Sequence, residues 1–171
     1  TDRMPRLYGV QAAGSDFLWQ AQQEGRFTPD DLLSMPPIKA RTAADSLSAG
    51  LPRDRLKAMR AVRETGGSFL RVDDADILAA VPDLARNSGV FAEPAGAACL
   101  AGLRAAIAAG MVAPSETVCL VATGSGLKDI GALEAAPRAF PPAVISPDSA
   151  GLDAALDAVA ATLQPQKASR T

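Results

Sequence analysis

The 171-residue sequence contains no histidine, and this absence removes several kinds of active site. A Ser–His–Asp triad, a histidine metal centre and a histidine general base are excluded, because each of them needs an imidazole side chain, the group that changes charge near neutral pH. Aromatic residues make up only 4% of the chain. Catalysis by this chain therefore has to depend on lysine, acidic groups, hydroxyls or a cofactor, and we predict no metal site.

The chain also lacks a strong excess of charge and a long apolar run. Its net charge of −2 gives no electrostatic reason to expect nucleic acid or an anionic membrane as a partner. No apolar run is long enough to span a bilayer, and we expect a cytoplasmic protein without a signal peptide. The two cysteines, Cys99 and Cys119, lie in apolar surroundings, so we predict two buried free thiols in a reducing compartment.

Strand-like and helix-like patterns alternate along the chain. Strands are predicted over residues 6–12, 68–72, 117–122 and 143–146, and helices over 16–24, 52–65, a segment after Asp73, 94–110 and a segment after Ser149. Residues 27–51 contain several prolines and are predicted to be mostly irregular. The alternation indicates the α/β class, with three layers (α/β/α) around a mainly parallel sheet.

Two of these elements carry specific predictions about burial. The helix over 94–110 places Leu100, Leu103 and Ile107 on an apolar line and fills most other positions with Gly or Ala, so it can pack closely against a sheet. Residues 117–122 (TVCLVA) are apolar throughout, which is typical of a strand that is covered on both faces.

Two polar patches, residues 93–96 and 123–129, lie at the ends of these elements. In α/β proteins, sites concentrate at the carboxyl edge of the sheet. The Gly-rich turn in the second patch suits an anion or a flat ligand, but it equally fits a tight strand-to-helix turn. Glu93 by itself fits a helix-start carboxylate, and Lys128 with Asp129 fits a local surface pair. The hydroxyl side chains of residues 41–49 either face a ligand or satisfy their own turns.

Taken together, the motifs are more specific than any one of them. The order VFAEPAGAA, LAGL and ATGSGLKD, preceded by TAADSL, GLPR and KAMRAVRETGG, resembles the threonine synthase family of pyridoxal-phosphate (PLP) enzymes. That family has the tryptophan-synthase-β-like fold, fold type II. The resemblance extends from the first strand to GLKDI and fades over the last ~40 residues. EPAGA also fits threonine and serine dehydratases, whereas TGSGLKD favours threonine synthases.

The resemblance implies roles for particular residues. Thr123 would bond the pyridine nitrogen of the cofactor, and Glu93 would lie near the ring edge. Gly124 and Ala95 would allow the backbone to approach the flat cofactor. Thr42 and Ser46 are candidate substrate contacts. The partner would be a small amino-acid substrate such as O-phosphohomoserine, and relatives of this fold are commonly homodimers.

The resemblance also implies what the chain does not contain. The Schiff-base lysine and the Gly-rich loop for the cofactor phosphate belong to a part of the family that precedes Thr1. None of the four lysines, Lys39, Lys57, Lys128 and Lys167, stands in the matching context. We therefore expect residues 1–171 to be the C-terminal portion of the large PLP-binding domain, with no catalytic residue and no turnover in isolation.

Three hypotheses about function follow. The first is the C-terminal segment of a threonine synthase-like lyase, which forms threonine and phosphate from O-phosphohomoserine and water. The second keeps the fold and changes the reaction to that of a threonine/serine dehydratase, a cysteate synthase or another β-replacement enzyme. The third is a non-catalytic, truncated paralogue that binds or regulates a partner.

Overall fold

The computed structural model describes residues 4–131 and 149–163, and the chain divides into two compact units, residues 1–137 and 138–171. The first unit contains the elements β1 (Tyr8–Ala12), α1 (Phe17–Gln23), α2 (Pro29–Ser34), the 3₁₀ helix η1 (Asp45–Leu47), α3 (Arg55–Glu64), β2 (Ser68–Val72), α4 (Asp74–Ser88), α5 (Pro94–Ala108) and the 3₁₀ helix η2 (Gly126–Lys128). The second unit contains α7 (Ser149–Leu163), the helix predicted after residue 149.

The two strands pair in parallel, as the sequence predicts. Tyr8 lies opposite Ser68 and Ala12 lies opposite Val72. Both strands therefore end at the same edge, where the Ala13 amide extends the pairing by donating to the Val72 carbonyl at 2.7 Å. Successive side chains of a strand point to opposite faces, so β2 sends Phe69 to one face of the sheet and Val72 to the other.

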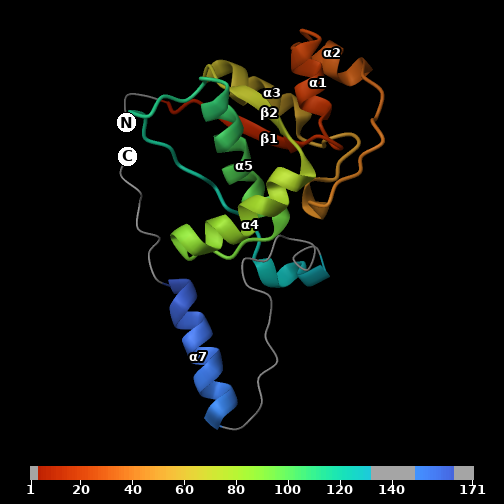
Figure 1. Cartoon of the computed structure of the whole chain (residues 1–171). Coiled ribbons are helices and arrows are strands. Elements are labelled where there is room, and N and C mark those ends of the chain that lie inside the picture. The colour runs from red at the N-terminus through yellow and green to blue at the C-terminus, as the bar shows by residue number, and fades with distance from the viewer. Residues whose placement is uncertain (1–3, 132–148, 164–171) are drawn as a thin grey trace. The chain divides into compact units, whose positions relative to one another are not determined.

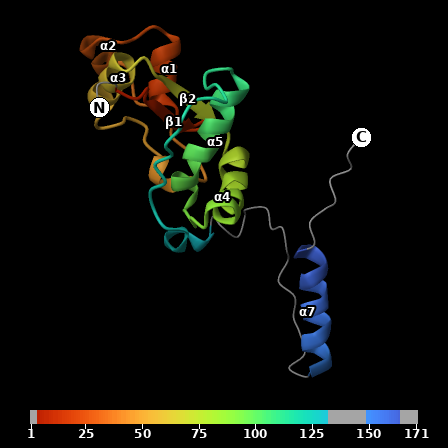
Figure 2. The ribbon, with the colours of Figure 1, turned by 90° about the vertical axis from the view of Figure 1, so that its left-hand side faces the viewer.

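Helices cover both faces of this parallel pair, which gives the predicted α/β/α layering. Figure 2 shows the strands between α1 and α3 on one side and α4 and α5 on the other. One core lies under α1, α2 and α3 and includes Phe17, Leu32, Met59 and Val62. The other lies under α4 and α5, which lie against each other in Figure 1. It is built largely from Ile77, Val81 and alanines.

The region 27–51 is less irregular than its prolines indicate. It contains α2, which begins with a capping box in which the Thr28 hydroxyl accepts from the Asp31 amide while the Asp31 carboxylate accepts from the Thr28 amide. Pro29 occupies the first helical turn, where a missing N–H costs nothing. The prolines therefore mark a helix start here as well as interrupting the chain.

The buried face of α5 is not the predicted one. Ala97, Ala101 and Gly102 face the core, whereas Leu100 and Leu103 are half-buried and Ile107 is exposed. The reason is the close approach of α5 to β1: a Cβ at Gly102 would overlap the Val10 side chain and lie 3.0 Å from its Cγ1. Only small side chains fit between the helix and the strand, so the larger ones are displaced from the contact.

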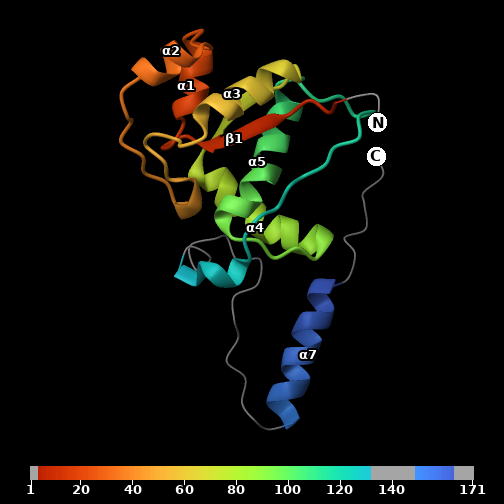
Figure 3. The same ribbon diagram turned by 180° about the vertical axis from the view of Figure 1, so that it is seen from behind.

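Residues 117–122 do not form the predicted strand. They form an irregular segment that pairs with neither β1 nor β2 (Figure 3). Val121 in this segment is 71% exposed. A strand needs a neighbour for its backbone hydrogen bonds, and within residues 4–131 and 149–163 none lies beside this segment. Cys119 is consequently exposed and Cys99 half-buried, so the prediction of two buried thiols is wrong for Cys119. The predicted strand at 143–146 lies outside the described residues.

Candidate functional site

The loop of residues 41–49 lies against the carboxyl edge of the sheet. After β1, Gly14 accepts a hydrogen bond from the Arg41 amide at 2.8 Å. The Ser15 hydroxyl then accepts from the Ala49 amide at 2.9 Å and donates to the Leu47 carbonyl at 2.7 Å. Asp16 is the N-cap of α1, and the hydroxyl of the preceding Ser15 fixes this loop.

Asp74, in the first turn of α4, holds the same loop from the end of β2. Its carboxylate accepts from the Thr42 hydroxyl and, at 2.8 Å, from the Ala43 amide. The Thr42 hydroxyl also accepts from the Ala44 amide at 3.1 Å. Thr42, a predicted substrate contact, therefore has its hydroxyl engaged within the fold.

The two polar patches of the sequence meet in the structure. The Glu93 amide donates to the Gly124 carbonyl at 3.1 Å, and the Gly126 amide donates to the Phe91 carbonyl at 3.0 Å. Between these bonds Ala92 and Ser125 form an antiparallel bridge. The turn that begins at Thr123 is thereby attached to the start of α5, about thirty residues earlier in the chain.

Two glycines make this approach possible. A Cβ at Gly96, in the first turn of α5, would overlap the carbonyl oxygen of Thr123 and lie 3.0 Å from its carbonyl carbon. Gly124 has φ of +72°, a conformation that favours glycine, and a Cβ there would lie 2.6 Å from the Glu93 carboxyl carbon. The backbone of the turn thus lies directly on the helix and on the Glu93 side chain.

Glu93, Ser46 and Lys128 form one polar cluster, which we call the Glu93 cluster. The Lys128 ammonium lies 3.2 Å from each carboxylate oxygen of Glu93 and donates to the Ser46 hydroxyl at 2.7 Å. The Ser46 hydroxyl lies 3.3 Å from Glu93 Oε1 and donates to it. Three separate segments therefore converge here: the loop at η1, the start of α5 and η2.

The cluster contains a buried charge. Glu93 is only 5% exposed, whereas the Lys128 side chain is 59% exposed. A buried carboxylate is costly unless it is paired and hydrogen-bonded, and Lys128 and Ser46 meet both needs. Within the part of the chain that the structure describes, no buried side-chain nitrogen or oxygen lacks a hydrogen-bond partner.

The remaining predicted residues lie close by. Thr123 is exposed, and among the described residues its hydroxyl has no partner, so it is accessible to a ligand. Ala95 is half-buried in the first turn of α5. Sequence reasoning assigned no site role to Lys128, Asp74 or Gly96, although Gly96 and Lys128 stand inside the quoted motifs. Asp74 carried no signal beyond its place at a helix start.

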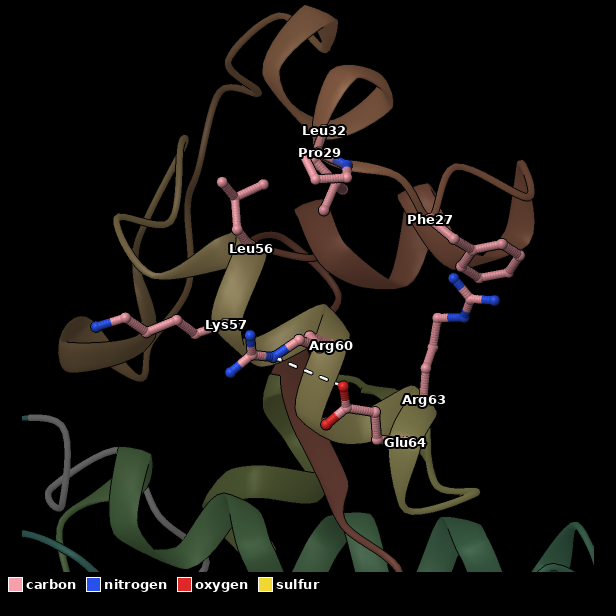
Figure 4. A pocket seen from close by; sticks show the side chains of 8 residues that line it. All are labelled: Phe27, Pro29, Leu32, Leu56, Lys57, Arg60, Arg63 and Glu64. Carbon is pink, nitrogen blue, oxygen red and sulfur yellow. Dashed lines mark ion pairs between the residues drawn. The ribbon is translucent and has the colours of Figure 1, made fainter.

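An open cleft of about 550 Å³ lies elsewhere, on the side of the sheet that α2 and α3 cover. Its lining consists of four apolar residues, Phe27, Pro29, Leu32 and Leu56, and four charged ones, Lys57, Arg60, Arg63 and Glu64. Figure 4 shows the Arg63 guanidinium over the Phe27 ring, 4.5 Å from its centroid, and the Arg60–Glu64 ion pair at 3.8 Å. No residue of the Glu93 cluster lines it.

Two other kinds of feature are absent from residues 4–131 and 149–163. No helix there has both the length and the apolarity to cross a bilayer. No group of three or more acidic, cysteine or histidine side chains lies close enough together to bind a metal ion.

A parallel α/β fold with polar turns gathered at its carboxyl edge is the architecture of many cofactor enzymes. Residues 1–124 match the family described as "Pyridoxal-phosphate dependent enzyme", and the chain belongs to that family. The cofactor of this family is PLP.

Within the family, the chain is similar to threonine synthases, as the motifs predict. It is 40% identical over 131 residues to the threonine synthase of Methanosarcina acetivorans, a match that covers 75% of this chain and 31% of the relative. It is 41% identical over 128 residues to those of Mycobacterium leprae and Synechocystis, covering 75% of this chain and 32% and 30% of the relatives. The chain thus spans about a third of the length of the curated relatives it matches.

The residues present fit one side of a PLP site. An exposed neutral hydroxyl, Thr123, is fixed on a turn whose backbone is tightly packed, and a carboxylate lies directly behind that turn. A hydroxyl suits a pyridine nitrogen, which needs a single hydrogen-bond partner. Lys128 is bound to Glu93 and Ser46, and the expectation that it is not the lysine that holds the cofactor stays a prediction.

Proposed function

We propose that this chain is the C-terminal third of a threonine synthase-like PLP enzyme, a lyase that converts O-phosphohomoserine and water to threonine and phosphate. The observation that carries the proposal is the attachment of the Thr123 turn to the start of α5, through the Glu93–Gly124 and Gly126–Phe91 hydrogen bonds. The similarity to threonine synthases supports the choice of reaction.

Thr123 would hold the ring nitrogen of PLP. When bound, PLP supplies an electron sink for elimination and replacement at the carbons of an amino acid. A threonine hydroxyl carries no charge and does not keep the ring nitrogen protonated as a carboxylate does. The resulting sink is mild, which suits elimination and replacement better than transamination.

The other residues of the site have supporting roles. Glu93 would lie near the ring edge, with its charge balanced by Lys128, and Gly124 and Ala95 would leave room for the flat ring. Ser46 is the better of the two substrate candidates, because it belongs to the Glu93 cluster. Thr42 would act indirectly, by fixing the loop that carries Ser46 through its bond to Asp74.

The proposal makes the rest of the enzyme necessary for activity. The part of the family that carries the cofactor-binding lysine and the phosphate loop has no match in this chain, so we expect no turnover from residues 1–171 alone. A homodimer and a cytoplasmic location stay predictions from the sequence.

The role of Thr123 is tested in a chimaeric enzyme, in which residues 4–131 replace the matching segment of the Methanosarcina relative. Thr123→Val should shift the absorbance of bound PLP and lower threonine formation at least tenfold, because the ring nitrogen loses its partner. Thr123→Ser should restore both, and Thr117→Val, at another exposed threonine, is the control. Unchanged absorbance and unchanged rate in Thr123→Val would refute the assignment.

The reaction is tested with the same chimaera. Phosphate release from O-phosphohomoserine supports the threonine synthase reaction. Keto-acid release from threonine, with no phosphate release from O-phosphohomoserine, would favour the dehydratase alternative. PLP binding without either reaction would favour a non-catalytic member of the family.

A further inference from the structure

The Glu93 cluster contains a lysine, Lys128, to which the proposed chemistry gives no contact with cofactor or substrate. Lys128 lies on η2, directly after the turn that carries Thr123, and its side chain crosses back to Glu93 and Ser46. Among the described residues, Lys128 is the partner of Glu93 in an ion pair. The contact therefore joins the far end of the turn to the start of α5 and to the loop at η1.

Backbone contacts to the start of α5 also hold the turn. Residues 117–122, which precede it, are irregular, mostly exposed and unpaired with either strand. The turn itself is held by two backbone hydrogen bonds to residues 91 and 93 and by the contact of Thr123 with Gly96. An ion pair to a buried carboxylate is a strong addition to these contacts, because separating it leaves Glu93 buried without a counter-charge.

We infer that Lys128 is a positioning residue: by pairing with Glu93 and Ser46 it closes the turn and sets the place of Thr123. The inference rests on the proposed function only where it concerns the cofactor, since the closing of the turn is a property of the chain itself. Lysine suits this position because its three N–H donors serve Ser46 and both oxygens of Glu93.

The first experiment measures the turn in the 171-residue chain by amide hydrogen exchange. The reporters are the amides of residues 93 and 126, which form the two hydrogen bonds between the turn and α5. Lys128→Met should raise exchange at both amides at least tenfold, and Lys128→Arg should raise it less. The control is Lys57→Met, because the Lys57 side chain is 83% exposed and its ion pair with Asp54 is long, at 3.7 Å.

A second substitution separates the loss of the ion pair from a general loss of folding. In Lys128→Met/Glu93→Gln the buried charge is gone, and a neutral amide needs no counter-ion. Protection at residue 126 should therefore return at least partly toward that of the parent chain. Exchange in Lys128→Met equal to that of the parent, or a double variant more open than Lys128→Met, would overturn the inference and leave the proposed function standing.

The second experiment asks whether Lys128 acts through Thr123. In the chimaeric enzyme, Lys128→Met should raise the dissociation constant of PLP at least threefold, read from the cofactor's absorbance. In the Thr123→Val background the same change should have no further effect, because residues that act as one unit are not additive. Equal effects in both backgrounds, or none in either, would overturn the positioning role and reduce Lys128 to a structural ion pair.

Discussion

The close approach of the Thr123 turn to α5 makes Gly96→Ala the sharpest test of the site geometry. The new Cβ would overlap the Thr123 carbonyl oxygen and lie 3.0 Å from its carbonyl carbon and 3.1 Å from the Ala92 Cβ. Ordinary contacts between carbon atoms are about 3.5–4.0 Å, so the carbonyl carbon has to move by at least about 0.5–1 Å. Gly96 itself is buried in the first turn of α5 and has no room to retreat.

The loss of stability in Gly96→Ala depends on whether the turn or α5 moves. Overpacking of this kind costs typically ~1–3 kcal/mol, and alanine in place of glycine returns about 0.5–1 kcal/mol of helix propensity. The turn is held by two backbone hydrogen bonds, each worth about 0.5–1.5 kcal/mol net, so it should open before α5 shifts. We expect a net loss of about 1–2 kcal/mol and a fall in Tm of roughly 2–8 °C for a chain of this size.

The assay combines thermal unfolding with amide exchange at residues 93 and 126. Gly96→Ala should lower protection at both amides about tenfold. Gly102→Ala, which overlaps Val10 instead, should lower Tm without a selective effect on these amides. Gly131→Ala, which has no described atom within 4 Å of the new Cβ, should change neither. If Gly96→Ala matches Gly131→Ala in both measurements, Thr123 does not lie on the helix and the proposed site geometry is wrong.

The two cysteines should differ in reactivity, because burial raises the pKa of the Cys99 thiol whereas Cys119 is exposed. At pH 8 iodoacetamide should label Cys119 at least tenfold faster than Cys99, as measured by peptide mass mapping. Equal protection of both thiols would instead indicate that residues 117–122 are covered, as the predicted strand would be. The Asp83 carboxylate on α4 accepts from Arg104 on α5 at 2.8 Å, and this bond lowers the pKa of Asp83 below its ordinary value. A lowered folded-state pKa stabilises above the unfolded value, so Arg104→Gln should lower Tm by a few degrees at pH 7 and by progressively less below about pH 4. A Tm difference that stays constant with pH would contradict this.

The local elements follow closely from the sequence. The strand over residues 68–72 has the predicted limits, and α1, α4 and α5 lie close to their predicted ranges. The helix α3 begins at Arg55, three residues after its predicted start. These features depend on neighbours within a few residues along the chain, which a sequence displays directly. The helix α2 was missed because a proline in a first helical turn resembles a proline in a loop.

Burial was harder to predict, because it depends on how closely two elements approach. Periodicity selected the leucine face of α5, but contact with β1 brings a glycine and alanines inward. The apolar composition of residues 117–122 predicted a covered strand, yet a strand forms only beside another strand. Composition describes what a segment can do, and its neighbours decide whether it does so.

The sequence by itself determined the parallel α/β class, the absence of histidine chemistry, and the two motifs whose order indicated a PLP enzyme. Only the tertiary structure decided that Glu93 and Gly124 are neighbours, that Lys128 belongs to Glu93, and that Asp74 holds the loop of Ser46. Each of these contacts joins residues about thirty or more apart in the chain. They arise because the loop at η1, the start of α5 and the turn before η2 meet in the folded chain, and no local pattern records that convergence.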